Sequence, residues 1–268
     1  KPSGKEERIA TQYIPRNFPP LEYVIKLTGS IKINSEIDIR DRALISFTLL
    51  SGMRDKAIIS LPLGCFDENE LAISQNPKLG VQTKFSKHIP TTLFIFDNSL
   101  LDYVIEWVKL LKSKGYGSQD PLFPRAKTDK GEEDLSFETA SEVEPVFWQG
   151  TGRIREIFKN RAKEANMPYY PPHTFRHLAV SLALKHCKNG EEMKAISQNF
   201  GHEHIATTLS DYANYPPQRL SEIIKNIDFS GKPRETIEEK IDEKFDELMK
   251  KLEKNQDLHQ AFGGHGAV

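Results

Sequence analysis

The sequence predicts a mainly α-helical protein with a small antiparallel β-sheet, an α+β fold. Apolar residues recur at helical spacing over most of the chain, and three short β-like pieces lie between Glu70 and Phe96. No apolar run approaches the roughly 20 residues that a membrane span requires. With 268 residues, of which 38% are hydrophobic, the chain can bury one large core or two smaller ones.

The first elements are expected after a linker-like start. Residues 1–18 mix charges, glycine and proline, and position 1 is Lys rather than Met, which suggests a piece of a longer protein. Helical patterns follow over Leu21–Leu27 and Asp38–Leu50, and Ser51-Gly52 breaks the second one. A short helix over Asp55–Ser60 then ends before Leu61-Pro62.

A change of periodicity marks the sheet. Short β-like pieces are expected at Leu71–Ile73, Val81–Thr83 and His88–Pro90, with turn residues between them. Leu100–Leu111 returns to a helix with one apolar side. Gly115–Gln149 is irregular and acid-rich, so it is interpreted as a surface loop or insertion.

The second half of the sequence is again helical. Helices are expected over Thr151–Ala165, over His173–His186 after Pro171-Pro172, and over Glu191–Phe200. Shorter helical stretches should follow over His204–Leu209 and Gln218–Asn226. Residues 231–268 form a charged helix and a tail, and the helix carries an apolar stripe from Ile237 to Leu252. Both packing on the parent domain and docking into a neighbouring protomer fit this stripe.

The charge totals hide a local asymmetry. Lys and Arg number 37 and Asp and Glu 38, yet residues 151–190 hold eight basic and two acidic side chains. Such a stretch could meet phosphates, although charge alone favours a solvated helix face. Cys65 and Cys187 stand apart, so reduced thiols are expected rather than a disulfide or zinc site. The start lacks a signal-peptide pattern, which indicates a soluble, cytoplasmic protein.

Six polar residues carry little information singly but point to one reaction as an ordered set. They are Arg54, Lys84, His173, Arg176, His202 and Tyr212. The set suits attack by a tyrosine on a DNA phosphodiester, with no metal and no cofactor. Arg54 and Arg176 would bind the phosphorane, whose non-bridging oxygens carry extra negative charge.

The remaining four residues have distinct expected roles. Tyr212 is the nucleophile, and His173 takes its proton. Lys84, on a mobile hairpin, protonates the leaving 5′ oxygen, and His202 hydrogen-bonds a non-bridging oxygen. Two residues are kept in reserve: Lys87 as the acid and Tyr215 as the nucleophile, although Pro216-Pro217 stiffens the backbone of Tyr215.

In this order the sequence resembles the tyrosine recombinases, also called phage-type integrases, over Pro19 to Phe229. The matching pieces are Leu50–Arg54, Thr83–Pro90, His173–His177, and Phe200–Thr208 followed by Tyr212. The resemblance implies a helical catalytic domain with a small sheet, a 3′-phosphotyrosyl intermediate and no cofactor. It also implies strand exchange in a homo-tetramer on double-stranded DNA recombination sites, with accessory DNA-bending proteins as further partners. Integration or excision of a mobile element, on a bacterial or phage nucleoid, is the expected task.

The resemblance also suggests a domain plan. Residues 1–18 would be the linker from an absent N-terminal DNA-binding domain, 19–230 the catalytic domain, and 231–268 a C-terminal helix and tail. The chain departs from the family pattern where Ala57 replaces an acidic residue and Asp55 directly follows Arg54. The sequence also fits two alternatives: a tyrosine-type DNA topoisomerase, and a catalytically silent DNA-binding accessory protein.

Overall fold

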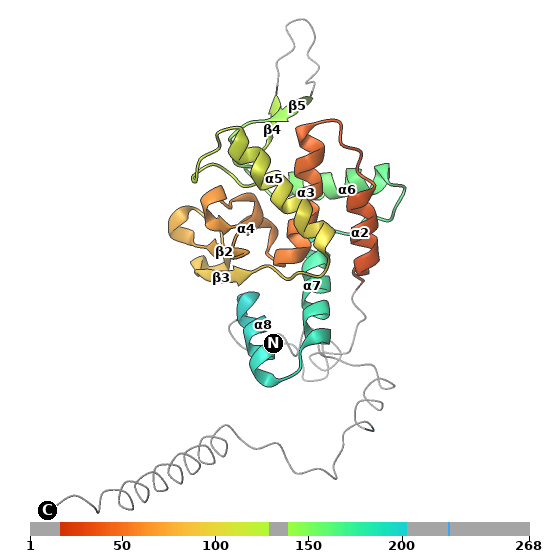
Figure 1. The fold of residues 1–268 in the computed structure, drawn as a ribbon, viewed down its shortest axis with the longest axis vertical. Helices are drawn as coiled ribbons and strands as arrows, with labels where there is room; N and C mark the ends of the chain where they lie inside the picture. The colour runs from red at the N-terminus through yellow and green to blue at the C-terminus, as the bar shows by residue number, and fades with distance from the viewer. Residues whose placement is uncertain (1–16, 129–138, 203–224, 226–268) are drawn as a thin grey trace, which may run out of the picture. The chain divides into compact units, whose positions relative to one another are not determined.

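Figure 1 shows the chain in a computed structural model that describes residues 17–128, 139–202 and 225. The chain divides into two compact units, residues 1–214 and 215–268. All described residues belong to the first unit except Lys225, which belongs to the second. The expected elements at 204–209 and 231–268 lie outside the described residues. Within the described part, no helix combines the length and apolar character needed to cross a membrane.

The helix at the centre of the fold is α3, Glu36–Ser51. Ser35 caps its N-terminus by accepting a hydrogen bond from the Asp38 N–H, and Gly52 ends it in the left-handed conformation. All residues from 43 to 51 are buried, including three with hydroxyl groups that donate to carbonyl oxygens four residues earlier. The predicted helix over Asp38–Leu50 is confirmed, and it is enclosed on all sides rather than on one face.

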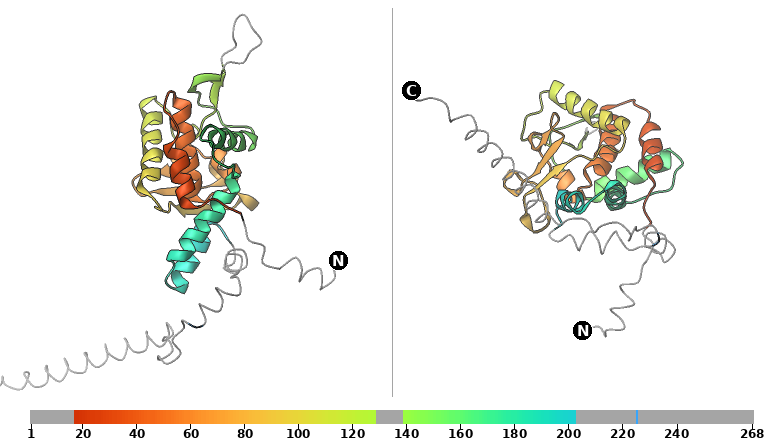
Figure 2. Two further views of the ribbon diagram at one scale, coloured as in Figure 1. Left: turned by 90° about the vertical axis from the view of Figure 1, so that its right-hand side faces the viewer. Right: turned by 60° about the horizontal axis from the view of Figure 1, so that its bottom comes forward.

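Two helices pack against α3. Helix α2, Leu21–Gly29, and helix α5, Asn98–Ser113, both contact it, and α5 runs beside it in Figure 2. The buried side of α5 includes Leu100, Trp107 and Leu111. The apolar stripe that the sequence predicted there therefore faces the core.

The small sheet is antiparallel, with strand order β1-β2-β3. Its strands are β1 (Phe66–Asp67), β2 (Ala72–Gln75) and β3 (Ile89–Thr92), and Gln75 pairs with Ile89. The strand predicted at Val81–Thr83 is wrong. That part of the β2–β3 connection lies between two 3-10 turns, η2 (Pro77–Leu79) and η3 (Lys84–Ser86), and the Gln82 N–H donates to Ser60 Oγ instead of to a strand.

The segment predicted as a surface loop, Gly115–Gln149, is in fact tied into the body. Strands β4 (Ala126–Thr128) and β5 (Thr139–Val143) form an antiparallel hairpin. Leu122 and Phe123 are buried, and the Leu122 carbonyl accepts a hydrogen bond of 2.8 Å from Trp107 Nε1. The loop prediction therefore fails for the part of this segment that contributes to the core.

The remaining helices are α4 (Asp55–Ile59), α6 (Gly152–Glu164), α7 (Pro172–His186) and α8 (Gly190–Asn199). The sequence predicted all four with small shifts at their ends. Helix α7 begins at Pro172, where the missing N–H of proline costs no helical hydrogen bond. Helices α7 and α8 contact each other, and Figure 1 shows them below the sheet.

A buried charge network joins α3 to α6. Arg161 Nη2 lies 2.7 Å from Asp38 Oδ1 and 2.8 Å from Asp41 Oδ2, and Asp41 Oδ1 also pairs with Arg40 at 2.7 Å. Burial alone would raise the pKa of Asp38, but hydrogen bonds from Ser35, the Asn34 N–H and Arg161 lower it overall. Arg161 therefore belongs to the interior and is not part of a phosphate-binding face.

Candidate active site

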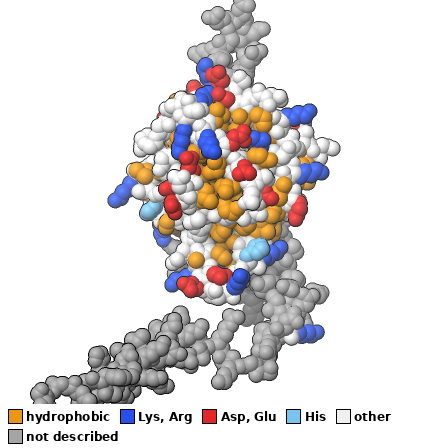
Figure 3. All heavy atoms as spheres, viewed as in Figure 1, with side chains coloured by type: hydrophobic (Ala, Val, Ile, Leu, Met, Phe, Trp, Pro, Cys, Tyr) orange, Lys and Arg blue, Asp and Glu red, His pale blue; other side chains and the backbone are white. Residues whose placement is uncertain are grey.

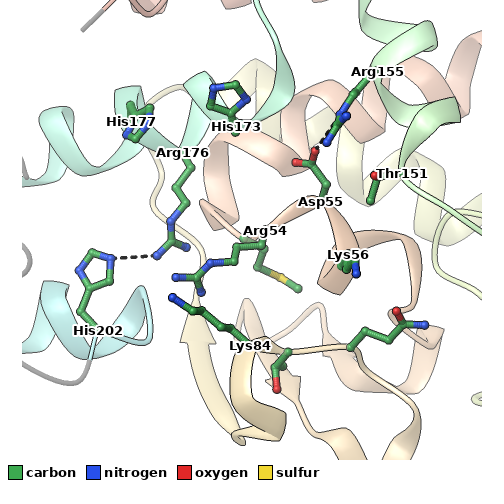
Figure 4. A pocket seen from close by; sticks show the side chains of 13 residues that line it. Arg54, Asp55, Lys56, Lys84, Thr151, Arg155, His173, Arg176, His177 and His202 are labelled. Atoms are coloured by element: carbon green, nitrogen blue, oxygen red, sulfur yellow. Dashed lines mark hydrogen bonds and ion pairs between the residues drawn. The ribbon is translucent and has the colours of Figure 1, made fainter. Parts of the chain in front are cut away.

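A cavity of about 870 Å³ brings together five of the six predicted site residues. Arg54, Lys84, His173, Arg176 and His202 all line it. They come from the start of α4, the β2–β3 connection, α7 and the residues after α8. Figure 4 shows the cationic ends of Arg54, Lys84 and Arg176 pointing toward one another. The sixth residue, Tyr212, and its reserve Tyr215 lie outside the described residues.

The position of Arg54 depends on the end of α3. Gly52 has φ +56, a conformation that favours glycine, and a Cβ there would come within 2.2 Å of Phe200 Cε1. The chain therefore turns sharply against the Phe200 ring, and Arg54 follows as the N-cap residue directly before α4. This is the helix break that the sequence indicated, with the left-handed glycine as its physical cause.

Arg176 is held by main-chain carbonyl groups from two other segments. Its Nη1 donates to Gly52 O at 2.6 Å, and its Nη2 donates to Phe200 O at 2.8 Å. The guanidinium carbon lies 5.2 Å from the centre of the Phe200 ring, and the residue is 8% exposed. These contacts fix the guanidinium before any phosphate is bound, which is the preorganisation that electrostatic catalysis requires.

His202 is paired with Arg176. Its Nε2 lies 3.0 Å from Arg176 Nη2. An arginine can only donate, so Nε2 is the acceptor in this contact, which leaves Nδ1 as the ring nitrogen that can carry a proton. Nδ1 is therefore the atom of His202 that can donate to a phosphate oxygen in this arrangement.

Lys84 and its reserve Lys87 occupy different places. Lys84 lies in η3, exposed, with Nζ 4.8 Å from the centre of the Phe85 ring, and it lines the cavity. Lys87 lines a neighbouring hollow between β3 and α8 instead. Lys84 thus shares the cavity with the two arginines, and Lys87 is not among the residues that line it.

Asp55 and Arg155 are cavity residues whose pairing the sequence did not indicate. Arg155 Nε lies 3.8 Å from Asp55 Oδ2, and Figure 4 draws this contact beside His173. Burial raises the pKa of Asp55, while the charges of Arg155 and His173 partly oppose that rise. The Asp55 carboxylate thus pairs with Arg155, and only the three-dimensional fold could reveal that partner.

Six further side chains complete the wall of the cavity: Met53, Lys56, Gln82, Thr83, Thr151 and His177. His177 follows His173 by one helical turn, and their ring centres lie 6.0 Å apart. The sequence offered that spacing as a signal, but gave none for Lys56 and Thr151. Across the described ranges, no group of three or more His, Cys, Asp or Glu residues is arranged to hold a metal ion.

Solved structures with a similar fold include the XerA recombinase, with a TM-score of 0.52, 18% identity, and coverage of 84% of this chain and 67% of that one. Another is the Tn1549 transposon integrase in complex with transposon right-end DNA, with a TM-score of 0.51, 15% identity, and coverage of 80% and 66%. The XerH site-specific recombinase bound to its difH substrate gives a TM-score of 0.48 at 16% identity, with 79% of this chain covered.

The chain spans about two thirds of the XerA chain and about half of the XerH chain. Among curated protein sequences, none matches it. The model of the phage integrase family matches residues 24–219, which is most of the chain and includes all six predicted site residues. The helical fold with its small sheet agrees with that match. The chain belongs to the phage integrase family.

Proposed function

We propose that this chain is a site-specific DNA recombinase that cleaves and rejoins DNA through a 3′-phosphotyrosyl intermediate. The observation that supports this most strongly is the convergence of Arg54, Lys84 and Arg176 on one cavity. Three cationic groups aimed at a common volume suit a phosphate, and two of them are guanidinium groups with a fixed charge. Two imidazoles beside them supply proton transfer.

The reaction uses these residues as follows. The Tyr212 oxygen attacks phosphorus, and its proton passes to His173. The bond between phosphorus and the 5′ oxygen breaks, and Lys84 gives that oxygen a proton, so that a 5′ hydroxyl and a 3′-phosphotyrosine result. Arg54 and Arg176 bind the non-bridging oxygens, whose charge grows in the phosphorane. Attack by a 5′ hydroxyl of a second strand reverses these steps and rejoins the DNA.

The proposed substrate is double-stranded DNA, which is negatively charged. The lining of the cavity is predominantly basic, whereas the described surface is not basic everywhere. On the described part of the face drawn in Figure 3, basic and acidic side chains are interspersed. The cavity, in contrast, has one acidic side chain, Asp55, among its basic ones. The complex of the Tn1549 integrase with transposon-end DNA supports the same class of substrate.

The wider assembly is also part of the proposal. We infer a catalytic domain over residues 19–230, preceded by a linker at 1–18 and followed at 231–268 by a C-terminal helix, which docks on another protomer, and a tail. A homo-tetramer on two paired sites, assisted by DNA-bending proteins, would exchange the strands. The task would be integration or excision of a mobile element at the nucleoid.

An adduct assay tests the proposal. The full chain is incubated with nicked duplexes taken from the DNA that flanks its own gene, and denaturing gels are searched for protein covalently attached to DNA. We expect an adduct with the unaltered chain and with Tyr215→Phe, and none with Tyr212→Phe, which removes a single oxygen. Adduct formation by Tyr212→Phe would reject this nucleophile. Relaxed rather than recombined products would indicate a topoisomerase, and no adduct with any duplex would reject the enzyme.

A further inference from the structure

The tip of the β2–β3 connection exposes an aromatic ring beside the cavity. Phe85 is 73% exposed, more than any other large hydrophobic side chain in the described part of the chain. Lys84 precedes it, and Lys87 follows two residues later. An isolated exposed apolar residue is common. A ring flanked by lysines at the rim of the proposed phosphate-binding cavity, however, suits a partner that has both negative charge and apolar surface.

The backbone holds this ring outward. Phe85 (φ 60°, ψ 23°) and Ser86 (φ 51°) both adopt the left-handed backbone conformation, which residues other than glycine rarely take. Thr83 Oγ1 donates to Lys87 O at 2.6 Å, and the Ser86 N–H donates to Thr83 O at 3.3 Å. Val81, 2% exposed, anchors the base of the connection. The projection of Phe85 is therefore built into the loop.

The location of the tip indicates the chemistry of its partner. Gln82, Thr83 and Lys84 line the cavity, so the ring stands directly beside the place proposed for the cleaved phosphate. The Phe85 ring already lies 4.8 Å from the Lys84 ammonium. A polyanion attracts the lysines, and a nucleobase or deoxyribose offers the apolar surface that an exposed ring needs. DNA supplies both the negative charge and the apolar surface within a single nucleotide.

We propose that Phe85 is a wedge that inserts at the base step next to the cleaved phosphate and partly unstacks it. This inference rests on the proposed function, since it places the phosphate in the cavity. The wedge would open the duplex where the strands are exchanged, and it would fix which phosphate along the strand reaches Arg54 and Arg176. Both effects depend on the ring itself and not on the charge of its neighbours.

The test measures base unstacking and not the cleavage rate, because loss of the ring would also disturb Lys84. The full chain carries Tyr212→Phe to stop the chemistry, and 2-aminopurine replaces a base on each side of the cleavage position mapped in the adduct assay. We expect protein binding to raise the 2-aminopurine fluorescence severalfold with Phe85 present, and to leave it near that of free DNA with Phe85→Ala. Anisotropy of a labelled duplex sets saturating protein in each case.

Leu79→Ala is the matched control. Leu79 is a 44% exposed side chain in the same connection that does not line the cavity, so its truncation should leave the fluorescence rise intact. An equal rise with Phe85→Ala would overturn the wedge while the adduct assay still supported the recombinase. Loss of the rise in both variants would assign it to the loop and overturn the wedge. A chain that forms no adduct would remove the recombinase and the wedge together.

Discussion

Arg176 Nη1 donates a 2.6 Å hydrogen bond to the carbonyl oxygen of Gly52, a residue 124 positions earlier in the sequence. Gly52 lies two residues before Arg54, so this bond connects the segments that carry the two arginines proposed to bind the phosphate. The bond therefore fixes the Arg176 guanidinium relative to the backbone that carries Arg54.

Replacing Arg176 should reduce both activity and stability. Arg176→Ala removes a preorganised donor, and we expect single-turnover cleavage to fall by about two orders of magnitude or more, with a much smaller loss of DNA affinity. The variant also leaves the carbonyls of Gly52 and Phe200 without this donor, which should lower the free energy of unfolding by about 1–3 kcal/mol. Arg54→Ala, at a more exposed position, should show the rate loss with less destabilisation. Equal losses of rate and affinity would contradict the transition-state role.

Lys84→Ala should be rescued by a substrate that needs no acid. When sulfur replaces the bridging 5′ oxygen, the leaving group departs as a thiolate without a proton. We expect Lys84→Ala to recover most of its cleavage rate on that substrate, as measured by adduct formation over time. Arg54→Ala should stay slow, because its loss affects the phosphorane. Rescue of Lys87→Ala in place of Lys84→Ala would move the acid to Lys87.

Asp55→Asn should stabilise the protein at neutral pH. Burial raises the pKa of Asp55, so the folded chain binds this proton more tightly than the unfolded chain. Stability is then highest below the unfolded pKa and falls as the pH rises through the folded pKa. The Asn variant lacks this loss, so its free energy of unfolding in urea should exceed that of the unaltered chain at pH 7. The difference should disappear at a pH below the ordinary aspartate pKa.

Asp38→Asn should behave in the opposite way. The hydrogen bonds of Asp38 outweigh its burial and lower its pKa, so its charge stabilises the fold above the unfolded pKa. That contribution is lost as the pH falls through the folded pKa. We therefore expect the variant to be less stable than the unaltered chain at pH 7 and to approach it in acid. A constant difference at all pH values would show that packing, and not charge, causes the loss.

Gly52→Ala should distort the site through steric overlap. The new Cβ would meet the Phe200 ring at 2.2 Å in a left-handed backbone, which combines a conformational penalty of about 1–2 kcal/mol with overpacking of about 1–3 kcal/mol. The cleavage rate should fall together with stability, because the Phe200 carbonyl also accepts a hydrogen bond from Arg176. Gly80→Ala is the control: its φ is +91, but no atom lies within 4 Å of the new Cβ. If the thermal unfolding temperature falls equally in both variants, the steric overlap with Phe200 does not destabilise the protein and the prediction is wrong.

Much of the helical framework could be predicted from the sequence, because an apolar stripe such as that of α5 records which side meets the core. The failures have physical causes. Val81 is an apolar residue of the kind found in strands, but it is buried as the anchor of a loop. Leu122 is a core residue within an acid-rich, irregular segment. Periodicity cannot distinguish these cases. Arg161 also counted toward a basic helix, although its charge is turned inward.

The site shows the same division. Residue type and order were enough to predict five of the side chains that line the cavity, because the proposed phosphate chemistry needs those groups. The pairing of Asp55 with Arg155 joins two segments far apart in sequence, and no local pattern specifies such a contact. Tyr212 remains a prediction, because it lies outside the described residues.

Arg176 and Lys84 differ in what would happen to them if catalysis were no longer needed. Arg176 bonds two interior carbonyl groups, so a descendant that had lost its tyrosine would still keep this arginine in order to fold. Lys84 lies exposed on a surface turn, where its replacement would cost the fold little. In decayed relatives the lysine should therefore disappear first. An intact lysine is accordingly a better sign of a working enzyme than an intact arginine.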